Sequence, residues 1–110
     1  MSDCIFCKIA NKEIATNLLY EDEYIVAFND IEPVAPEHIL IIPKAHYATI
    51  EDVDNFDILS HIFSKVPQIA KDRGLEDYRI VINKGESAGQ TVFHLHIHII
   101  GGRRLQWPPG

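Results

Sequence analysis

Positive charge, cysteine and long apolar runs are all scarce in this chain. Lysine and arginine together number 10 against 16 aspartates and glutamates, so the formal net charge is −6. A groove for DNA or RNA needs a surplus of positive charge to neutralise phosphates. A membrane-spanning helix needs roughly 18–20 consecutive apolar residues, and no run in the chain approaches that length. We therefore expect neither nucleic acid nor a membrane as a partner, whereas a small anionic ligand held by local donors is compatible with the charge.

The N-terminus and the cysteine count bear on the compartment. Residues 1–4 lack the basic and apolar regions of a secretory signal peptide. In a reducing compartment the two cysteines are thiols or metal ligands rather than a disulfide. We expect a cytoplasmic protein, and the 110 residues suit one domain spanning residues 1–110.

The most informative feature that the chain does have is a row of alternating histidines. His94, His96 and His98 are separated by single aliphatic residues, and this period of two predicts a strand over residues 92–100 with one buried face. The three imidazoles then share the opposite face. The spacing alone leaves three interpretations open: a solvated face, a metal site, or acid, base or nucleophile chemistry without a metal.

Hydrophobic spacing also places the other elements. A short helix is predicted over residues 4–12 after an Asp3 cap, and a loop over residues 29–36, which contain two prolines. Further strands are predicted over residues 18–20, 24–28, 38–42 and 78–83. Strands joined by short turns, with one crossing helix, favour an α+β domain with an antiparallel sheet of about five strands.

One long helix is predicted to begin at Asp54 and to end at Gly74 as a C-cap residue. Its apolar stripe recurs every three or four residues and comprises Phe56, Leu59, Phe63, Val66 and Ala70. Pro67 lies inside this pattern, and it is expected to kink the helix or to divide it.

The loop before the histidine strand contains Gly89, Gln90 and Thr91. Glycine lets backbone N–H groups approach an anion closely, and the Thr91 hydroxyl adds a donor. A phosphate site and an ordinary hairpin turn are both consistent with this loop.

The histidine row and several other stretches together resemble the histidine triad (HIT) superfamily. The resemblance covers nearly the whole chain, including residues 28–31, 38–46, Asn83, 89–91 and 101–110. The ending Trp-Pro-Pro-Gly is more similar to the Hint branch of nucleoside phosphoramidases than to the dinucleoside polyphosphate hydrolases of the Fhit branch. The resemblance implies the HIT fold and a homodimer with a continuous sheet.

The resemblance implies a hydrolase that cleaves the P–N bond of AMP–amine conjugates. His96 matches the nucleophile, which forms a nucleotidyl-histidine intermediate before water releases AMP. His98 is a candidate proton donor and contacts the phosphate oxygens with Thr91, and His38 is a candidate for orienting the imidazoles. This mechanism requires no metal in catalysis.

Other functions remain open at this point. A dinucleoside polyphosphate hydrolase would use the same fold with a nucleotide leaving group, and a nucleotide-binding regulatory protein would have only incidental activity. A third alternative is a metalloenzyme that uses the three histidines as ligands of a catalytic zinc. For His38, an exposed histidine at a strand start is the alternative.

The resemblance also implies a set of substrate-binding residues. Phe6, Phe28 and Ile31 would enclose the purine base, and Asp30 would bind the ribose. Further contacts would come from Asn83, from the backbone of Gly89 and Gln90, and from Trp107 near the partner's substrate opening. Ordinary core packing is the alternative for the apolar residues, and an ordinary turn residue is the alternative for Asp30.

Cys4 and Cys7 have the spacing of half a zinc site. The resemblance implies that His46 and His94 complete a structural zinc site, as in bacterial-type members with this cysteine pair. Two thiols without metal are the alternative.

Overall fold

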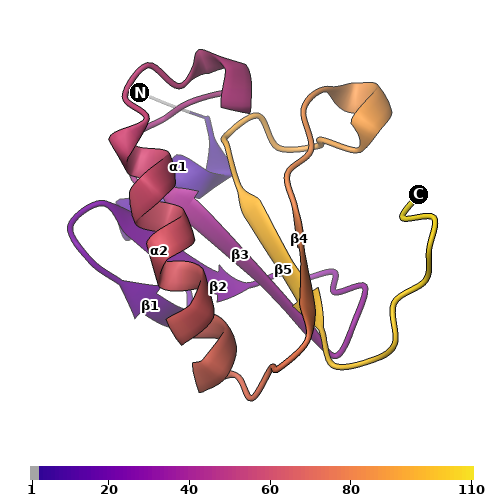
Figure 1. Cartoon of the computed structure of the whole chain (residues 1–110). Helices are drawn as coiled ribbons and strands as arrows, with labels where there is room; N and C mark the ends of the chain where they lie inside the picture. Colours follow the sequence, from indigo (N-terminus) through magenta and orange to yellow (C-terminus); the bar gives the residue numbers. More distant parts are fainter. Residues whose placement is uncertain (1–2) are drawn as a thin grey trace.

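The computed structural model describes residues 3–110 as a five-stranded antiparallel sheet with one helix on each face (Figure 1). The order across the sheet is β1-β2-β3-β5-β4. The expected α+β fold with a five-stranded antiparallel sheet is confirmed. The strands are β1 (Leu18–Glu21), β2 (Ile25–Asn29), β3 (Glu37–Pro43), β4 (Tyr78–Val81) and β5 (Ile97–Gly101). The helices are α1 (Ile5–Ala10) and α2 (Asp57–Asp72), with 3₁₀ turns at Ile50–Asp52 and Glu86–Ala88.

The apolar run of β3 supplies both faces of the sheet. Ile39 and Ile41 pack into the core beneath α2, whereas Leu40 and Ile42 pack into a second core beneath α1. Successive side chains of a strand point to opposite faces. A continuous aliphatic run therefore suits a strand covered on both sides.

The histidine strand is shorter than its alternating pattern predicts. Regular pairing of β5 with β3 ends at Ile41 opposite Ile97, so His94 and His96 precede the strand. The upstream segment is held instead by Leu95, whose N–H donates to Tyr47 O at 2.6 Å. Leu95 nevertheless packs into the same core as Ile97 and Ile99, beneath α2, while His94 and His96 are buried as well. The strand start at residue 92 was wrong: regular pairing with β3 begins only at Ile97, although β3 itself continues to Pro43.

Helix α2 begins at Asp57, three residues after the predicted start. Asn55 Oδ1 accepts from the Asp57 N–H at 3.1 Å. Asn55, and not Asp54, therefore supplies the acceptor for a backbone N–H at the start of the helix. The helix continues undivided through Pro67, whose exposed position leaves the freed carbonyl to water. No helix within residues 3–110 is long and apolar enough to cross a membrane.

The buried face of α2 is rotated from the predicted stripe. Ile62, Val66 and Ile69 are at most 2% exposed. Phe56 and Phe63 are 69% and 41% exposed, so their place in the stripe was wrong.

The remaining helix ends depend on one glycine and one cysteine. Gly74 has φ +76°, and the bonds Gly74 N–H to Lys71 O and Leu75 N–H to Ala70 O complete a Schellman motif. At the start of α1, the N-cap is Cys4, whose sulfur accepts from the Cys7 N–H at 3.4 Å. The Asp3 cap was therefore wrong by one residue.

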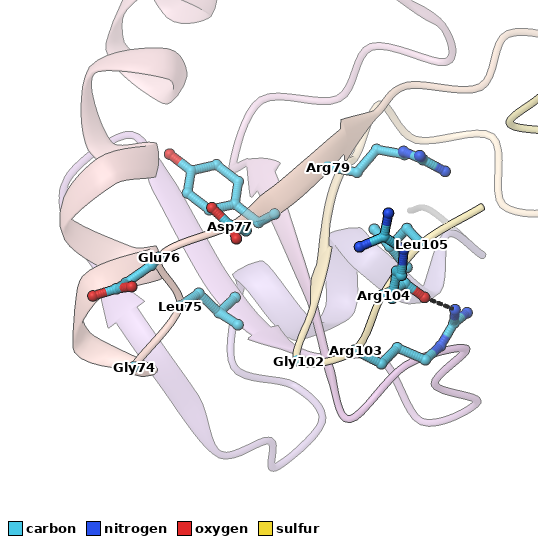
Figure 2. Close-up of a pocket in the computed structure, with 10 residues that line it drawn as sticks. Gly74, Leu75, Glu76, Asp77, Arg79, Gly102, Arg103, Arg104 and Leu105 are labelled. Atoms are coloured by element: carbon cyan, nitrogen blue, oxygen red, sulfur yellow. Dashed lines mark hydrogen bonds between the residues drawn. The ribbon is translucent and has the colours of Figure 1, made fainter. Parts of the chain in front are cut away.

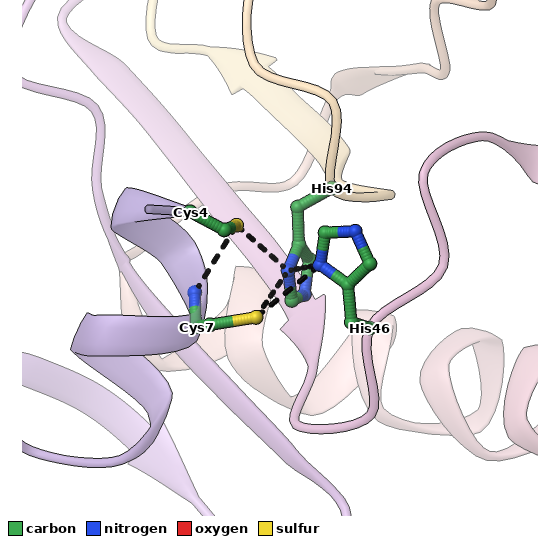
Figure 3. A group of neighbouring side chains, drawn as sticks. All are labelled: Cys4, Cys7, His46 and His94. Atoms are coloured by element: carbon green, nitrogen blue, oxygen red, sulfur yellow. Dashed lines mark hydrogen bonds between the residues drawn. The ribbon is translucent and has the colours of Figure 1, made fainter. Parts of the chain in front are cut away.

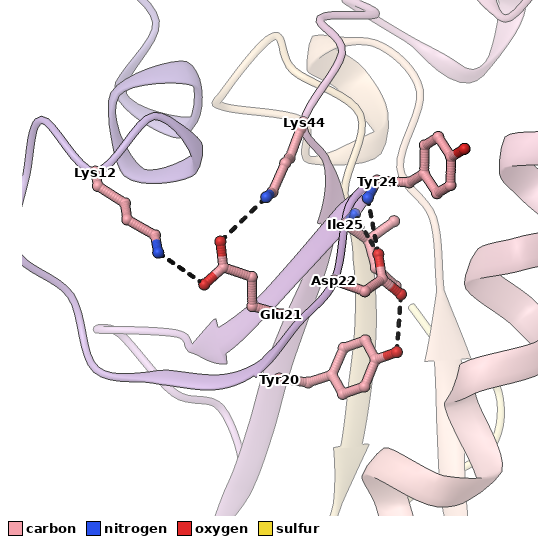
Figure 4. A network of polar contacts seen from close by, with 7 residues as sticks. All are labelled: Lys12, Tyr20, Glu21, Asp22, Tyr24, Ile25 and Lys44. Carbon is pink, nitrogen blue, oxygen red and sulfur yellow. Dashed lines mark hydrogen bonds and ion pairs between the residues drawn. The ribbon is translucent and has the colours of Figure 1, made fainter.

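The turn between β1 and β2 is organised by one carboxylate (Figure 4). Asp22 Oδ1 accepts from the N–H groups of Tyr24 and Ile25 at 2.8 and 3.0 Å. Its Oδ2 accepts from Tyr20 OH at 2.8 Å and lies 2.6 Å from His61 Nε2 on α2. Burial opposes ionisation, but these hydrogen bonds outweigh it and hold the pKa of Asp22 well below its ordinary 3.8. Asp22 therefore ties the hairpin to α2.

Replacing this carboxylate should destabilise the fold in a pH-dependent way. We expect Asp22→Ala to lower the free energy of unfolding by about 2 kcal/mol at pH 7. Since the folded pKa lies below the unfolded one, the contribution is complete above about pH 5 and is lost as the pH falls through 3.8 and below. Urea denaturation at several pH values measures this. Glu23→Ala, at an exposed position of the same turn, should change stability by less than about 0.5 kcal/mol. Equal losses in the two variants would contradict the prediction.

Candidate active site

A cavity of about 760 Å³ lies on the α1 face of the sheet. Helix α1, the segment before β1, the loop after β2 and the segment before β5 form its walls. Most of the residues singled out from the sequence lie around it: Phe6, Phe28, Asp30, Ile31, His38, Gly89, Thr91, His96 and His98. Segments far apart in the chain therefore converge on one concave site.

Three of the expected substrate-binding residues do not line this cavity. Gln90 is 1% exposed, and its amide donates to Ala48 O and Val92 O, so its side chain holds the loop together. Asn83 lies behind Gly89, where a Cβ on the glycine would be 3.6 Å from the Asn83 amide nitrogen. Trp107 is 78% exposed, with the Arg79 guanidinium 5.8 Å from its ring centroid.

The protonation of His38 and His98 follows from a chain of hydrogen bonds. The Val34 N–H donates to His38 Nδ1 at 3.1 Å, so neutral His38 carries its proton on Nε2. This nitrogen lies 2.8 Å from His98 Nδ1, which must accept. The proton of His98 is consequently on Nε2, a buried atom with no hydrogen-bond partner within residues 3–110. His98 lines the cavity, and its Nε2–H is a donor that no described residue uses.

His96 is oriented in the opposite sense. Its Nδ1 lies 2.7 Å from the backbone oxygen of His94, and a carbonyl can only accept, so Nδ1 carries the proton. The lone pair is then on Nε2, at the cavity wall that His96 forms. The Phe6 ring packs edge-on against this imidazole, with centroids 5.1 Å apart. The site therefore presents a nucleophilic nitrogen beside an N–H donor.

Burial keeps the donor histidine neutral. It lowers the pKa of His98 to about 4, with smaller contributions from the neighbouring His96 and His38. Burial likewise lowers the pKa of His38. At neutral pH both imidazoles are uncharged, so the hydrogen-bond chain needs only one proton on each ring.

The cavity combines an apolar wall with one carboxylate. Phe6 and Phe28 meet edge to face with centroids 5.6 Å apart. Asp30 Oδ1 accepts from the Glu32 N–H at 2.8 Å, and Oδ2 lies 3.4 Å from His38 Nε2. These two parts of the cavity suit a ligand with an aromatic heterocycle, which would pack on the apolar wall, and a hydroxyl-bearing substituent, which would donate to the carboxylate.

Beside the cavity, four side chains from distant segments converge (Figure 3). Cys4 Sγ is 3.3 Å from His94 Nδ1, and Cys7 Sγ is 3.2 Å from His46 Nδ1 and 3.5 Å from His94 Nδ1. The two Nδ1 atoms are 3.2 Å apart. Ligands of a tetrahedral zinc lie roughly 3.3 Å apart for two nitrogens and roughly 3.6 Å apart for nitrogen and sulfur. The cluster has the dimensions of a zinc site.

The tautomer of His94 supports the same interpretation. Its Nε2 lies 2.8 Å from Pro43 O and donates to it, so Nδ1 directs a lone pair at the two sulfurs. Burial lowers the pKa of His94 to about 4, although the bond to Pro43 opposes this. A neutral imidazole aimed at two cysteines is the form that binds a metal ion.

The three histidines of the row do not meet at one metal. His94 belongs to the cysteine cluster, while His98 groups with Asp30 and His38. In that second group His38 Nε2 already carries a proton, because the Val34 N–H occupies Nδ1. A metal there would require breaking that bond, so the arrangement does not favour a catalytic zinc on the row.

Several contributors to the site carry no signal in the sequence. Residues 14–17 line the cavity as an irregular segment without conspicuous chemistry. Val34 acts through its backbone N–H, a group that every residue except proline has. Val34 follows Pro33 and lies four residues before His38, but this position points to a contact with His38 only when the loop is known to fold back onto that residue.

Comparisons with known proteins agree with this geometry. The HIT domain family model matches residues 11–105. A HIT family hydrolase from Legionella pneumophila has a crystal structure that superposes with a TM-score of 0.93, at 47% identity over 98% of this chain and 100% of that one. A 14 kDa zinc-binding protein of Zea mays is 48% identical over 99% of this chain and 89% of its own length. An uncharacterized HIT-like protein of Synechococcus elongatus is 49% identical over 98% and 97% of the two chains. This chain therefore belongs to the HIT domain family.

Proposed function

We propose that this protein is a nucleotide-binding hydrolase that cleaves the P–N bond of purine nucleoside 5′-phosphoramidates and releases AMP, as in the Hint branch. The observation that carries this proposal is the opposite protonation of two adjacent imidazoles. His96 offers a lone pair on Nε2 because Nδ1 bonds to a carbonyl, and His98 offers an N–H on Nε2 because Nδ1 accepts from His38. The family resemblance supports the substrate class, and the titles of similar structures name HIT family hydrolases.

In the first step, His96 Nε2 attacks phosphorus and the bond from phosphorus to the amine breaks. The bond from Nδ1 to the His94 carbonyl stabilises the positive charge that develops on the imidazole. The departing nitrogen takes a proton, for which the neutral His98 Nε2–H is the candidate donor within the site. The negative charge left on His98 is stabilised by the N–H that His38 Nε2 donates to its Nδ1 and is offset by the positive charge on the His96 adduct, until the proton of the attacking water restores the N–H. Water then cleaves the nitrogen–phosphorus bond of the intermediate. Its hydroxyl completes AMP and its remaining hydrogen returns to His98.

The remaining residues bind the nucleotide. The base packs between Phe6, Phe28 and Ile31, and a ribose hydroxyl donates to Asp30. Thr91 and the backbone at Gly89 face the phosphate, and Asn83, Gln90 and Trp107 act from outside the cavity, by supporting the loop or by contacting a second subunit. No step requires a metal ion.

Loss of the nucleophile should abolish the reaction. With an adenosine 5′-phosphoramidate of a fluorescent amine, we expect the wild type to release amine and His96→Ala to be slower by about 10⁴-fold or more. His61→Ala, which removes a histidine on α2 far from the cavity, should retain wild-type rates. Intact-mass measurement under alkaline denaturing conditions should detect an AMP adduct in the wild type.

A wild-type protein that releases no amine would overturn the phosphoramidase assignment. Faster cleavage of dinucleoside polyphosphates than of phosphoramidates would favour the Fhit-type alternative. Tight AMP binding with negligible turnover of both substrates would favour a regulatory nucleotide-binding protein.

We also propose that Cys4, Cys7, His46 and His94 hold a structural zinc ion. The converging lone pairs and the separations of 3.2–3.5 Å support this. The ion would join α1 to the segment before β5, and it would supply no reacting group. The maize relative is named as a zinc-binding protein, which agrees with this proposal.

Untagged protein should then contain about one zinc ion per chain by elemental analysis. We expect His46→Ala to lose most of the metal and to melt at a lower temperature, since metal binding contributes to folding. His61→Ala is the control for zinc content and should keep the metal; because His61 also bonds to Asp22, it is not used as a control for the melting temperature. Well under one zinc per chain in the wild type would contradict the proposal, as would an unchanged zinc content in His46→Ala.

We propose a homodimer in which two sheets join through β4. This strand lies at the end of the sheet and pairs only with β5 among the described strands, which leaves a row of backbone groups open to a second copy. Ile80, in the middle of β4, is 40% exposed. A small core gains stability from covering such an edge.

Sedimentation tests the dimer directly. The wild type should sediment as a dimer at micromolar concentration, and Ile80→Arg should sediment as a monomer because two like charges would face each other across the joined edges. Ile80→Val should remain dimeric. A monomeric wild type would exclude the dimer, and a dimeric Ile80→Arg would place its interface elsewhere.

A further inference from the structure

The loop between β2 and β3 reaches the histidine pair through Val34. Its N–H donates to His38 Nδ1 at 3.1 Å, and this bond keeps the His38 proton on Nε2, 2.8 Å from His98 Nδ1. The Val34 side chain is 57% exposed, so its own packing holds it only weakly. The position of this N–H therefore depends on what else contacts the loop.

Arg103, in the tail after β5, makes that contact. Its Nη2 donates to Val34 O at 2.9 Å and its Nη1 donates to Arg104 O at 3.0 Å. One guanidinium thus joins the tail to the loop through two carbonyls. Figure 2 shows the Arg103 side chain folded back along the tail, at the border of a second cavity of about 610 Å³.

The backbone beside Arg103 allows this close approach. Gly102 has φ +93°, and a Cβ at this position would lie 3.0 Å from Pro36 Cβ and 3.4 Å from the Glu37 nitrogen. The tail therefore packs directly against the end of the loop that contains Val34. A larger residue would push the two segments apart and would lengthen the reach that Arg103 has to span.

Withdrawal of the Val34 N–H would allow the reverse proton order along the histidine pair, which Asp30 Oδ2, 3.4 Å from His38 Nε2, still opposes. His38 Nδ1 would then be free to hold the proton, and Nε2 would become an acceptor. His98 would have to donate from Nδ1, leaving a lone pair on Nε2. A lone pair facing the cavity repels a phosphate oxygen and cannot protonate a leaving amine.

We propose that Arg103 is a positioning residue, which fixes Val34 so that the His98 N–H stays directed at the substrate. The effect on turnover rests on the proposed function, whereas the effect on the tautomers does not. Arg103 touches neither the substrate nor the reacting atoms, and it acts through a backbone group two contacts away from His98.

The test combines imidazole NMR with kinetics on Arg103→Ala, Arg103→Lys and Arg104→Ala. Long-range ¹H–¹⁵N spectra of the free protein report which ring nitrogen of His38 and His98 carries the proton. In Arg103→Ala we expect a mixture of tautomers, a kcat about tenfold lower and a KM within about twofold of wild type. Arg103→Lys, which can still donate to Val34 O, should recover part of kcat. Arg104→Ala is the matched control and should behave as the wild type.

Unchanged tautomers in Arg103→Ala would overturn the proposal, whatever the rate. A loss of thermal stability together with equal falls in kcat for Arg103→Ala and Arg104→Ala would also overturn it, because the tail would then act only as general support. If the wild type hydrolyses no phosphoramidate, the proposed function fails, and the tautomer spectra still decide the role of Arg103.

Discussion

The structure depends on the contacts that one buried residue, His94, makes in three directions. Its Nε2 donates to Pro43 O at the end of β3, its Nδ1 faces Cys4 and Cys7, and its carbonyl accepts from His96. His94 has no exposed surface, so each of these contacts is made away from water. In such surroundings a hydrogen bond is stronger than in water, and an unpaired polar group is costly. The same residue thereby orients a nucleophilic nitrogen and anchors the cysteine-bearing helix to the sheet.

The layers of the fold are readable from the sequence, but the limits of its elements are not. The burial of Leu95, Ile97 and Ile99 and that of the aliphatic run of β3 follow from local spacing, whereas the burial of His94 and His96 does not. The first residue of β5 depends on where its regular pairing with β3 begins, which is a non-local property. In α2 the apolar residues fit more than one stripe, and packing on the sheet selected Ile62 and Ile69 over Phe63.

The reactive side chains of the candidate site could be predicted from the sequence, whereas the groups that orient them could not. The histidines, the cysteines and the aspartate are identified by residue type, and the family resemblance indicated how they group. Backbone atoms leave no such mark, so the Val34 N–H and its contact with Arg103 appear only in three dimensions. Gln90 shows the converse: a polar residue next to the site whose side chain is used entirely within its own loop.

Helix α1 links two properties of the molecule that otherwise look independent. Its six residues are too few to be stable in isolation, so it stays folded only through what it touches. Phe6 lines the cavity, and Cys7, one residue later, faces His46 and His94. Local unfolding of α1 would therefore remove Phe6 from the cavity and Cys7 from the cysteine–histidine cluster at the same time. By thermodynamic linkage, an ion or molecule bound at the cysteines favours the folded helix and so increases the affinity of the cavity for its ligand. A ligand in the cavity increases the affinity of the cysteine cluster by the same free energy.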